Sequence, residues 1–194
     1  DAIWIERIRN ELPELPDAKR ARFEADLGLS AYDAEILAAD QALAAYFEVC
    51  VPLTGDPKLC ANWVMGEISR CLNDENITID AAPVSSERLA GLLNRIKDNT
   101  ISGKIAKTVF EKMWTSGKDA DAIIAAEGLK QVTDSSAIEA LIDEVIAANP
   151  GQAEEFRAGK DKLMGFFVGQ VMKASQGKAN PGMVNQILRK KLLG

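Results

Sequence analysis

The 194-residue chain contains no histidine. Because histidine is the usual general base, proton shuttle and metal ligand near neutral pH, its absence removes the commonest side chain for all three roles. No GxxxxGK[ST] phosphate loop is present, since Ser102-Gly103-Lys104 lacks the upstream glycine and is interpreted as a helix start. The run from Asn73 to Asn76 is too short for a calcium loop. We therefore expect no catalytic residue and no metal site in this chain.

Cysteine and long apolar runs are also scarce. Cys50, Cys60 and Cys71 are odd in number and form no CxxC pair, so we interpret them as packed cytosolic thiols rather than as disulfides or ligands. The apolar run between Lys162 and Lys173 has ten residues, about half of what a bilayer crossing needs. The chain begins at an aspartate without a cationic and apolar leader, and we interpret it as a piece of a longer cytoplasmic protein with no targeting segment and no membrane partner.

Strict alternation of apolar and polar residues is missing throughout, which predicts an all-α fold. Candidate N-caps mark several helix starts, and they are Asp17, Ser30, Asp56, Ser102 and Asp119. The expected helices cover residues 1–12, 17–28, 30–47, 56–72, 85–96 or 86–96, 102–114, 119–128, 135–148, 150–159, 163–172 and 181–192. Ile138, Leu141, Ile142 and Val145 are expected to point inward, and so are Trp63 and Trp114.

Small residues at Ser116-Gly117-Lys118 indicate a domain boundary. We predict two helical domains, an N-terminal helical bundle at residues 1–118 and a smaller domain at residues 119–194. Residues 1–16, with the ELPELP segment, are interpreted as a connector.

Charge is distributed unevenly. Residues 151–194 carry eight Lys or Arg and three acidic residues, a net charge of +5, whereas the rest of the chain carries 15 basic and 26 acidic residues, a net charge of −11. A basic cluster on an acidic protein predicts a polyanion contact at that end, because phosphate binding needs clustered positive charge. A solvated basic face, with Arg189 to Lys191 complementing a helix dipole, is the alternative.

The helix expected at residues 163–172 is apolar nearly all round, which predicts burial on most of its circumference. Gly165 and Gly169, four residues apart, share one face and would let another backbone come close. Phe166 and Phe167 are predicted to be core residues rather than base-stacking platforms.

Several long segments resemble the C-terminal half of the B subunit of the bacterial aspartyl/glutamyl-tRNA amidotransferases. The resemblance runs from about Leu12 to the last residue. The segments that carry it are LGLSAYDAEIL (27–37), AAYFE (44–48), DPKLCANWVMGEISRCLN (56–73), TISGKIAKTVFEKMW (100–114) and AGKDKLMGFFVGQVMKASQGKANPGMVNQILRKKL (158–192). It implies a helical domain to about Lys118 and a YqeY-like tail domain from about Asp119.

The resemblance also implies a function. In this family, the A subunit releases ammonia from glutamine, and the B subunit activates the side-chain carboxylate of Glu-tRNA(Gln) or Asp-tRNA(Asn) with ATP and Mg²⁺ for attack by the ammonia. Those phosphoryl-transfer residues belong to an N-terminal cradle domain, so no cofactor is expected in this chain. The implied partners are tRNA(Gln) or tRNA(Asn) and the A and C subunits of the amidotransferase, and no DNA is expected.

The resemblance assigns tRNA positioning to this part of the B subunit. Structured RNA is recognised by shape and phosphate contacts, so a basic ridge is sufficient. Gly159 and Gly177 are expected to allow close backbone approach. The predicted tRNA-binding residues are Lys160, Lys162, Lys173, Lys178, Asn180 and Lys190.

Two alternatives and two departures from the family pattern accompany this assignment. Asn180 precedes Pro181 and is also the natural cap of the last helix. The tail could instead be a protein-protein docking module within the amidotransferase and synthetase complex, with solubilising lysines. Cys60 stands where the family pattern has alanine, and Ser175-Gln176 stands where Thr-Lys or Ser-Arg is usual, which removes one positive charge.

Overall fold

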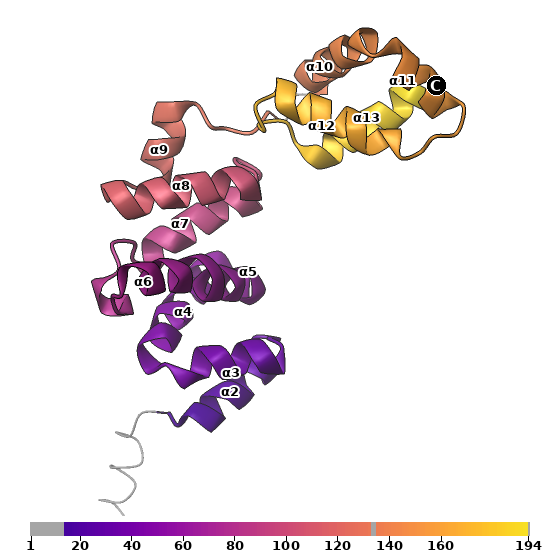
Figure 1. Cartoon of the computed structure of the whole chain (residues 1–194). Helices are drawn as coiled ribbons and strands as arrows, with labels where there is room; N and C mark the ends of the chain where they lie inside the picture. Colours follow the sequence, from indigo (N-terminus) through magenta and orange to yellow (C-terminus); the bar gives the residue numbers. More distant parts are fainter. Residues whose placement is uncertain (1–13, 133–134, 194) are drawn as a thin grey trace, which may run out of the picture. The chain divides into compact units, whose positions relative to one another are not determined.

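The computed structural model describes residues 14–132 and 135–193. Regular structure in these residues is helical (Figure 1), and the only β-type pairing within them is an isolated parallel bridge between Val132 and Ala179. The predicted all-α fold is confirmed. The helix predicted at residues 1–12 lies outside the described residues.

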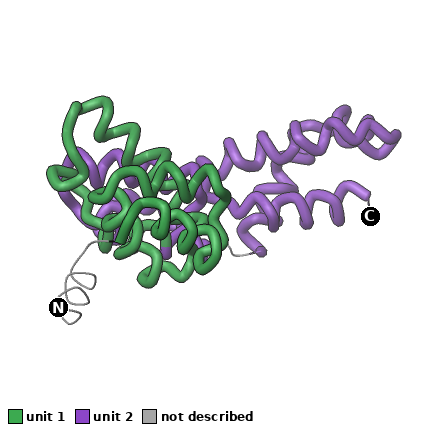
Figure 2. Tube along the Cα trace, turned by 90° about the horizontal axis from the view of Figure 1, so that it is seen from below, with its two compact units in different colours: residues 1–93 green, residues 94–194 purple. Residues whose placement is uncertain are grey.

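The chain divides into two compact units, residues 1–93 and 94–194 (Figure 2). The first contains α2 (Pro16–Ala25), α3 (Ala31–Ala39), α4 (Gln41–Thr54), α5 (Pro57–Trp63), the π-helix η1 (Val64–Ile68), α6 (Ser69–Glu75), the 3-10 helix η2 (Ile79–Ala81) and most of α7 (Ser86–Lys97). The second contains α8 (Gly103–Ser116), α9 (Ala120–Glu127), α10 (Ser135–Ala148), α11 (Pro150–Arg157), α12 (Leu163–Ala174) and α13 (Pro181–Leu193). The domain boundary predicted between residues 118 and 119 stays a prediction.

Three of the predicted helix caps are confirmed. The side chains of Ser30, Asp56 and Ser102 accept hydrogen bonds from backbone N–H groups three residues later, at 3.0 to 3.2 Å. Asp119 occupies the N-cap position of α9 but makes no cap hydrogen bond there. The prediction for Asp17 is wrong, because α2 begins at Pro16, which places Asp17 inside the first turn.

The single helix predicted over residues 30–47 is wrong. Asp40 has an extended backbone (φ −113°, ψ 113°), and its carboxylate accepts hydrogen bonds from the N–H groups of Ala42 and Leu43 at 2.9 and 3.0 Å. An aspartate that caps a new helix cannot also continue the previous one, so the segment forms two helices, α3 and α4.

The helix predicted at residues 56–72 is continuous but contains a π-helical turn, η1. The Ser69 hydroxyl donates to the carbonyl oxygen of Val64 at 2.9 Å inside this turn. The helix then continues to Glu75, where Asn76 ends it in the left-handed conformation (φ 51°).

Aromatic and sulfur-containing side chains fill the core of the first unit. The rings of Phe23 and Phe47 meet edge to face with centroids 5.2 Å apart. The Sγ atoms of Cys50 and Cys60 lie 3.2 Å apart in the interior, and this contact together with burial raises the pKa of the Cys50 thiol. All three cysteines are free and buried, as predicted, and Trp63 is buried as well.

In the second unit, α12 packs against α10, α11 and α13. Trp114 on α8 is buried, as predicted. The shared core of α10 to α13 consists of Ile138, Ile142, Val145, Ala153, Phe156, Phe167, Val171, Ala179, Val184, Leu188 and Leu192. Of the residues predicted to point inward on α10, only Leu141 is half-buried rather than buried.

The predicted burial of α12 on most of its circumference is wrong. Only Phe167 and Val171 are buried, and the other large apolar side chains of the helix are half-buried. Gly165 and Gly169 are exposed, and a Cβ added at either would meet nothing within 4 Å. The predicted close approach of a backbone therefore does not occur within the described fold. Instead, the helix buries one stripe and leaves its glycine face open.

Across the described residues, no individual helix is both long enough and apolar enough to cross a bilayer. Among the same residues, α3 and α4 meet both criteria only when they are taken together, and they are bent by 119° relative to each other.

The Asp40 cap yields a stability prediction. Asp40→Ala leaves two N–H groups at the start of α4 without their acceptor, so the free energy of unfolding is expected to fall by about 1 kcal/mol. Urea unfolding measures the change. Asp17→Ala is the matched control, because Asp17 also lies at a helix start but makes no cap bond, and it should change stability much less. Equal effects of the two variants would contradict the assigned cap.

Candidate nucleic-acid interface

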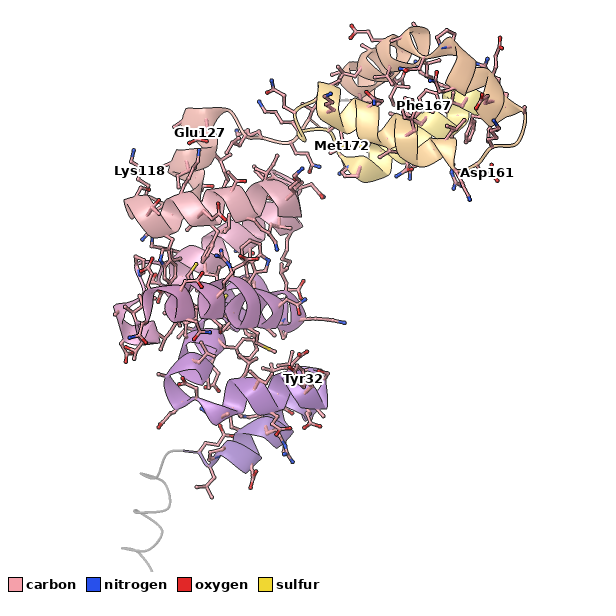
Figure 3. All side chains as sticks on the ribbon, viewed as in Figure 1. Tyr32, Lys118, Glu127, Asp161, Phe167 and Met172 are labelled. Atoms are coloured by element: carbon pink, nitrogen blue, oxygen red, sulfur yellow. The ribbon has the colours of Figure 1, made fainter. Side chains whose placement is uncertain are left out.

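The predicted RNA-binding residues lie near the two ends of α12. Figure 3 shows Asp161, which lies between Lys160 and Lys162, and Met172, which precedes Lys173, at opposite ends of this helix. A helix of 12 residues is about 18 Å long, so the two groups of cations are separated by roughly that length.

Lys160, Lys162 and Lys190 form the first group. Lys160 follows α11 in an exposed turn, and its ammonium pairs with Glu155 at 3.0 Å. Lys162 is exposed at the N-cap position of α12. Lys190 lies in the last turns of α13, which packs on α12. The Nε of Arg157, at the end of α11, donates to the carbonyl oxygen of Leu192 at 3.2 Å, so the end of α13 lies beside the end of α11. Because α11 leads into α12, Lys190 belongs with the first group.

Lys173, Lys178 and Asn180 form the second group. Lys173 is exposed in the last turn of α12, and Lys178 is half-buried in the connection to α13. This connection is held in place because the carbonyl oxygen of Lys178 accepts a hydrogen bond from the Val132 N–H at 2.6 Å. The structure thus joins residues 46 positions apart in the sequence at this end of the tail.

Asn180 serves as a helix cap. Its Oδ1 accepts hydrogen bonds from the N–H groups of Gly182 and Met183 at 2.9 and 3.1 Å, which confirms the capping alternative. Gly159 and Gly177 have positive φ values of 102° and 77°, a conformation that favours glycine. Their glycine identity is therefore explained by the backbone, and their contact with RNA stays a prediction.

Apart from Lys160, which pairs with Glu155, these cations differ from many others in the chain in having no ion pair among the described residues. Arg95 binds Asp121 and Asp98 at 2.6 and 2.8 Å, and its hydrogen bond holds the pKa of Asp121 below the ordinary value. Lys191 pairs with Asp143 on α10 at 2.6 Å. By contrast, no ion-pair partner occurs among the described residues for Lys162, Lys173, Lys178, Arg189 or Lys190. The tail therefore presents uncompensated positive charge.

The structure adds residues that the sequence did not indicate. A cavity of about 610 Å³ within the second unit is lined by Lys104 and Thr108 of α8 together with Gly169, Lys173 and Gln176. Lys104 lies 69 positions before Lys173, and no local motif connects them. Only the tertiary fold reveals this proximity.

Side chains that could bind a metal ion are not clustered in the described part of the chain. The described residues contain no group of three or more His, Cys, Asp or Glu side chains that could hold a metal ion. The described residues therefore offer no cluster of carboxylates for the Mg²⁺ that the family resemblance implies for the longer protein.

The comparisons with known proteins agree with the sequence resemblance. The model of the GatB domain matches residues 45–192. The B subunit of the aspartyl/glutamyl-tRNA(Asn/Gln) amidotransferase of Syntrophotalea carbinolica is 65% identical over 191 residues, covering 98% of this chain and 40% of that protein. The proteins of the same name from Geotalea uraniireducens and Hydrogenovibrio crunogenus are 60% and 59% identical, over 98% and 97% of this chain and 40% of each relative.

The chain thus spans about 40% of the length of these curated relatives. The family model covers most of the chain, including α12 and both groups of cations. On this match, the chain belongs to the GatB domain family.

Proposed function

We propose that this chain is the tRNA-positioning part of the B subunit of a glutamine-dependent aspartyl/glutamyl-tRNA amidotransferase. The similar proteins are named as the B subunit of that enzyme, which acts on tRNA(Asn) or tRNA(Gln). The A and C subunits are the protein partners on this proposal. ATP and Mg²⁺ act in the part of the B subunit that lies outside this chain.

The observation that carries the proposal is the uncompensated charge at the two ends of α12. Lys162 and Lys173 are 11 residues apart, which places them on the same face of the helix and about 16 Å apart along its axis. Cations that are not neutralised by carboxylates can replace the counterions of RNA phosphates, and this exchange drives polyanion binding. Because such contacts carry no base information, they suit the positioning of a folded RNA.

A docking role is the second candidate, and exposed apolar side chains in the first unit favour it. Tyr32 (Figure 3) is 69% exposed and Leu53 is 49% exposed. Large exposed side chains of this kind suit contact with a protein. The two roles can coexist, because these residues belong to the first unit and the uncompensated lysines belong to the second.

The tRNA-binding proposal predicts a salt dependence. Changing Lys160, Lys162 and Lys173 together to Ala should weaken binding to transcribed tRNA(Gln) or tRNA(Asn) and lower the slope of log K against log salt by about one for each lost phosphate contact. Fluorescence anisotropy across a salt series measures both quantities, with an unstructured RNA of equal length as competitor. Lys58→Ala, at an exposed lysine of the first unit, is the control.

Unchanged affinity and slope in the triple variant would contradict the proposal. Equal weak binding of the folded and unstructured RNAs would reduce the tail to a generic basic patch. Salt-insensitive binding to the A or C subunit, without tRNA binding, would favour the docking role.

Lys190 and Lys191 give a matched pair of neighbouring lysines. Lys191→Ala removes the ion pair with Asp143 and should lower the free energy of unfolding by about 0.5 kcal/mol, since Asp143 is largely exposed, and it should leave tRNA binding intact. Lys190→Ala should leave stability unchanged and weaken tRNA binding, because Lys190 has no ion-pair partner among the described residues. Urea unfolding and anisotropy on both variants test this separation, and the reverse assignment of effects would contradict it.

A further inference from the structure

The cavity lined by Lys104, Thr108, Gly169, Lys173 and Gln176 lies entirely within the second unit. Its volume of about 610 Å³ falls in the range of small-molecule sites, which is roughly 300 to 1,000 Å³. Two backbone hydrogen bonds from the segment that follows α9 help to position the walls of the cavity. The N–H of Gln131 donates to the carbonyl oxygen of Thr100, and the N–H of Val132 donates to that of Lys178.

The charge of the lining is one-sided. Lys104 and Lys173 are both exposed, and neither has an ion-pair partner among the described residues. None of the residues that line the cavity is acidic. Thr108 and Gln176 add neutral polar side chains that can donate hydrogen bonds. The site therefore favours an anionic occupant.

The remaining wall is apolar and partly made of backbone. Ile105, Leu129 and Met172 supply aliphatic and thioether surface, against which the flat face of a base or the edge of a ribose can pack. Gly169 lines the cavity, and a Cβ at that position would meet nothing within 4 Å apart from its chain neighbours and the adjacent backbone of its own helix. The space in front of Gly169 is thus open to a ligand rather than filled by the fold.

A mid-helix glycine with free space around it needs an explanation, because glycine destabilises a helix relative to alanine. Gly165 is a second such residue one turn earlier on α12, but it does not line the cavity. Comparing substitutions at Gly169 and Gly165 therefore separates loss of space in the cavity from a change in helix stability.

We propose that this cavity binds one nucleotide of the RNA, with its phosphate between Lys104 and Lys173 and its base or ribose against Ile105, Leu129 and Met172. The inference rests on the proposed function and extends it. It adds α8 to the RNA-binding surface, through a lysine that lies outside the tail. An RNA held in this way would connect α8 to α12 and so fix the tail against the helix that precedes it in the second unit.

The test uses the whole chain, folded tRNA and the variants Lys104→Ala and Gly169→Ala. Lys104→Ala should weaken binding several-fold and lower the salt slope by about one. Gly169→Ala should also weaken binding several-fold, because its methyl group occupies the cavity, while its unfolding midpoint in urea stays unchanged or rises. Gly165→Ala should raise the midpoint similarly and bind tRNA like the unchanged chain.

Each failure has a distinct signature. Absence of tRNA binding by the unchanged chain overturns the proposed function and the inference together. Normal binding by the unchanged chain, Lys104→Ala and Gly169→Ala overturns the inference alone. If Gly169→Ala instead weakens self-association or binding to the A or C subunit while tRNA binding is intact, the occupant is a protein and the RNA assignment is wrong.

Discussion

Burial of a single apolar stripe on α12 is the constraint on which the rest of the tail depends. Phe167 and Val171, four residues apart, are fully buried in the core shared by α10 to α13. Once this stripe faces inward, the helix has no remaining rotational freedom. At 100° per residue, Lys162 and Lys173 then lie within about 20° of each other on the opposite side. Core packing thus orients the face that we assign to RNA.

Charge compensation determines which cations remain available. In the second unit, Arg95 is held by two aspartates and Lys191 by Asp143, so these residues contribute to the fold rather than to an external contact. Lys162 and Lys173 have no such partner among the described residues. A net charge of −6 for the whole chain conceals the basic C-terminal segment, because 26 of the 29 acidic residues lie outside residues 151–194.

The sequence predicted the elements whose determinants are local. Ser30 and Ser102 were recognisable as caps because the interaction spans three residues, and the all-α class followed from periodicity. The break at Asp40 was missed, although an aspartate before Gln41 is itself a cap signal, because the apolar periodicity continues through it. Local sequence favoured one long helix, and the side-chain bonds of the cap favoured two.

The site was predictable only in part, for the same reason. Clustered charge indicated the tail, but nothing local distinguishes Lys190 from Lys191, since the difference is an acidic residue on α10. The sequence overestimated the burial of α12, because apolar residues on all sides of a helix do not show how many other helices a small domain can pack around it. Lys104 was inaccessible to sequence reasoning, because its proximity to Lys173 exists only in the folded chain.

Lysine footprinting tests the central claim most directly. The chain would be acetylated under native conditions with and without folded tRNA, and the modification of each lysine would be quantified by mass spectrometry. The account predicts that tRNA protects Lys162, Lys173 and Lys190, while the exposed Lys58 of the first unit reacts equally in both samples. Equal protection of all exposed lysines, or protection confined to the first unit, would contradict it.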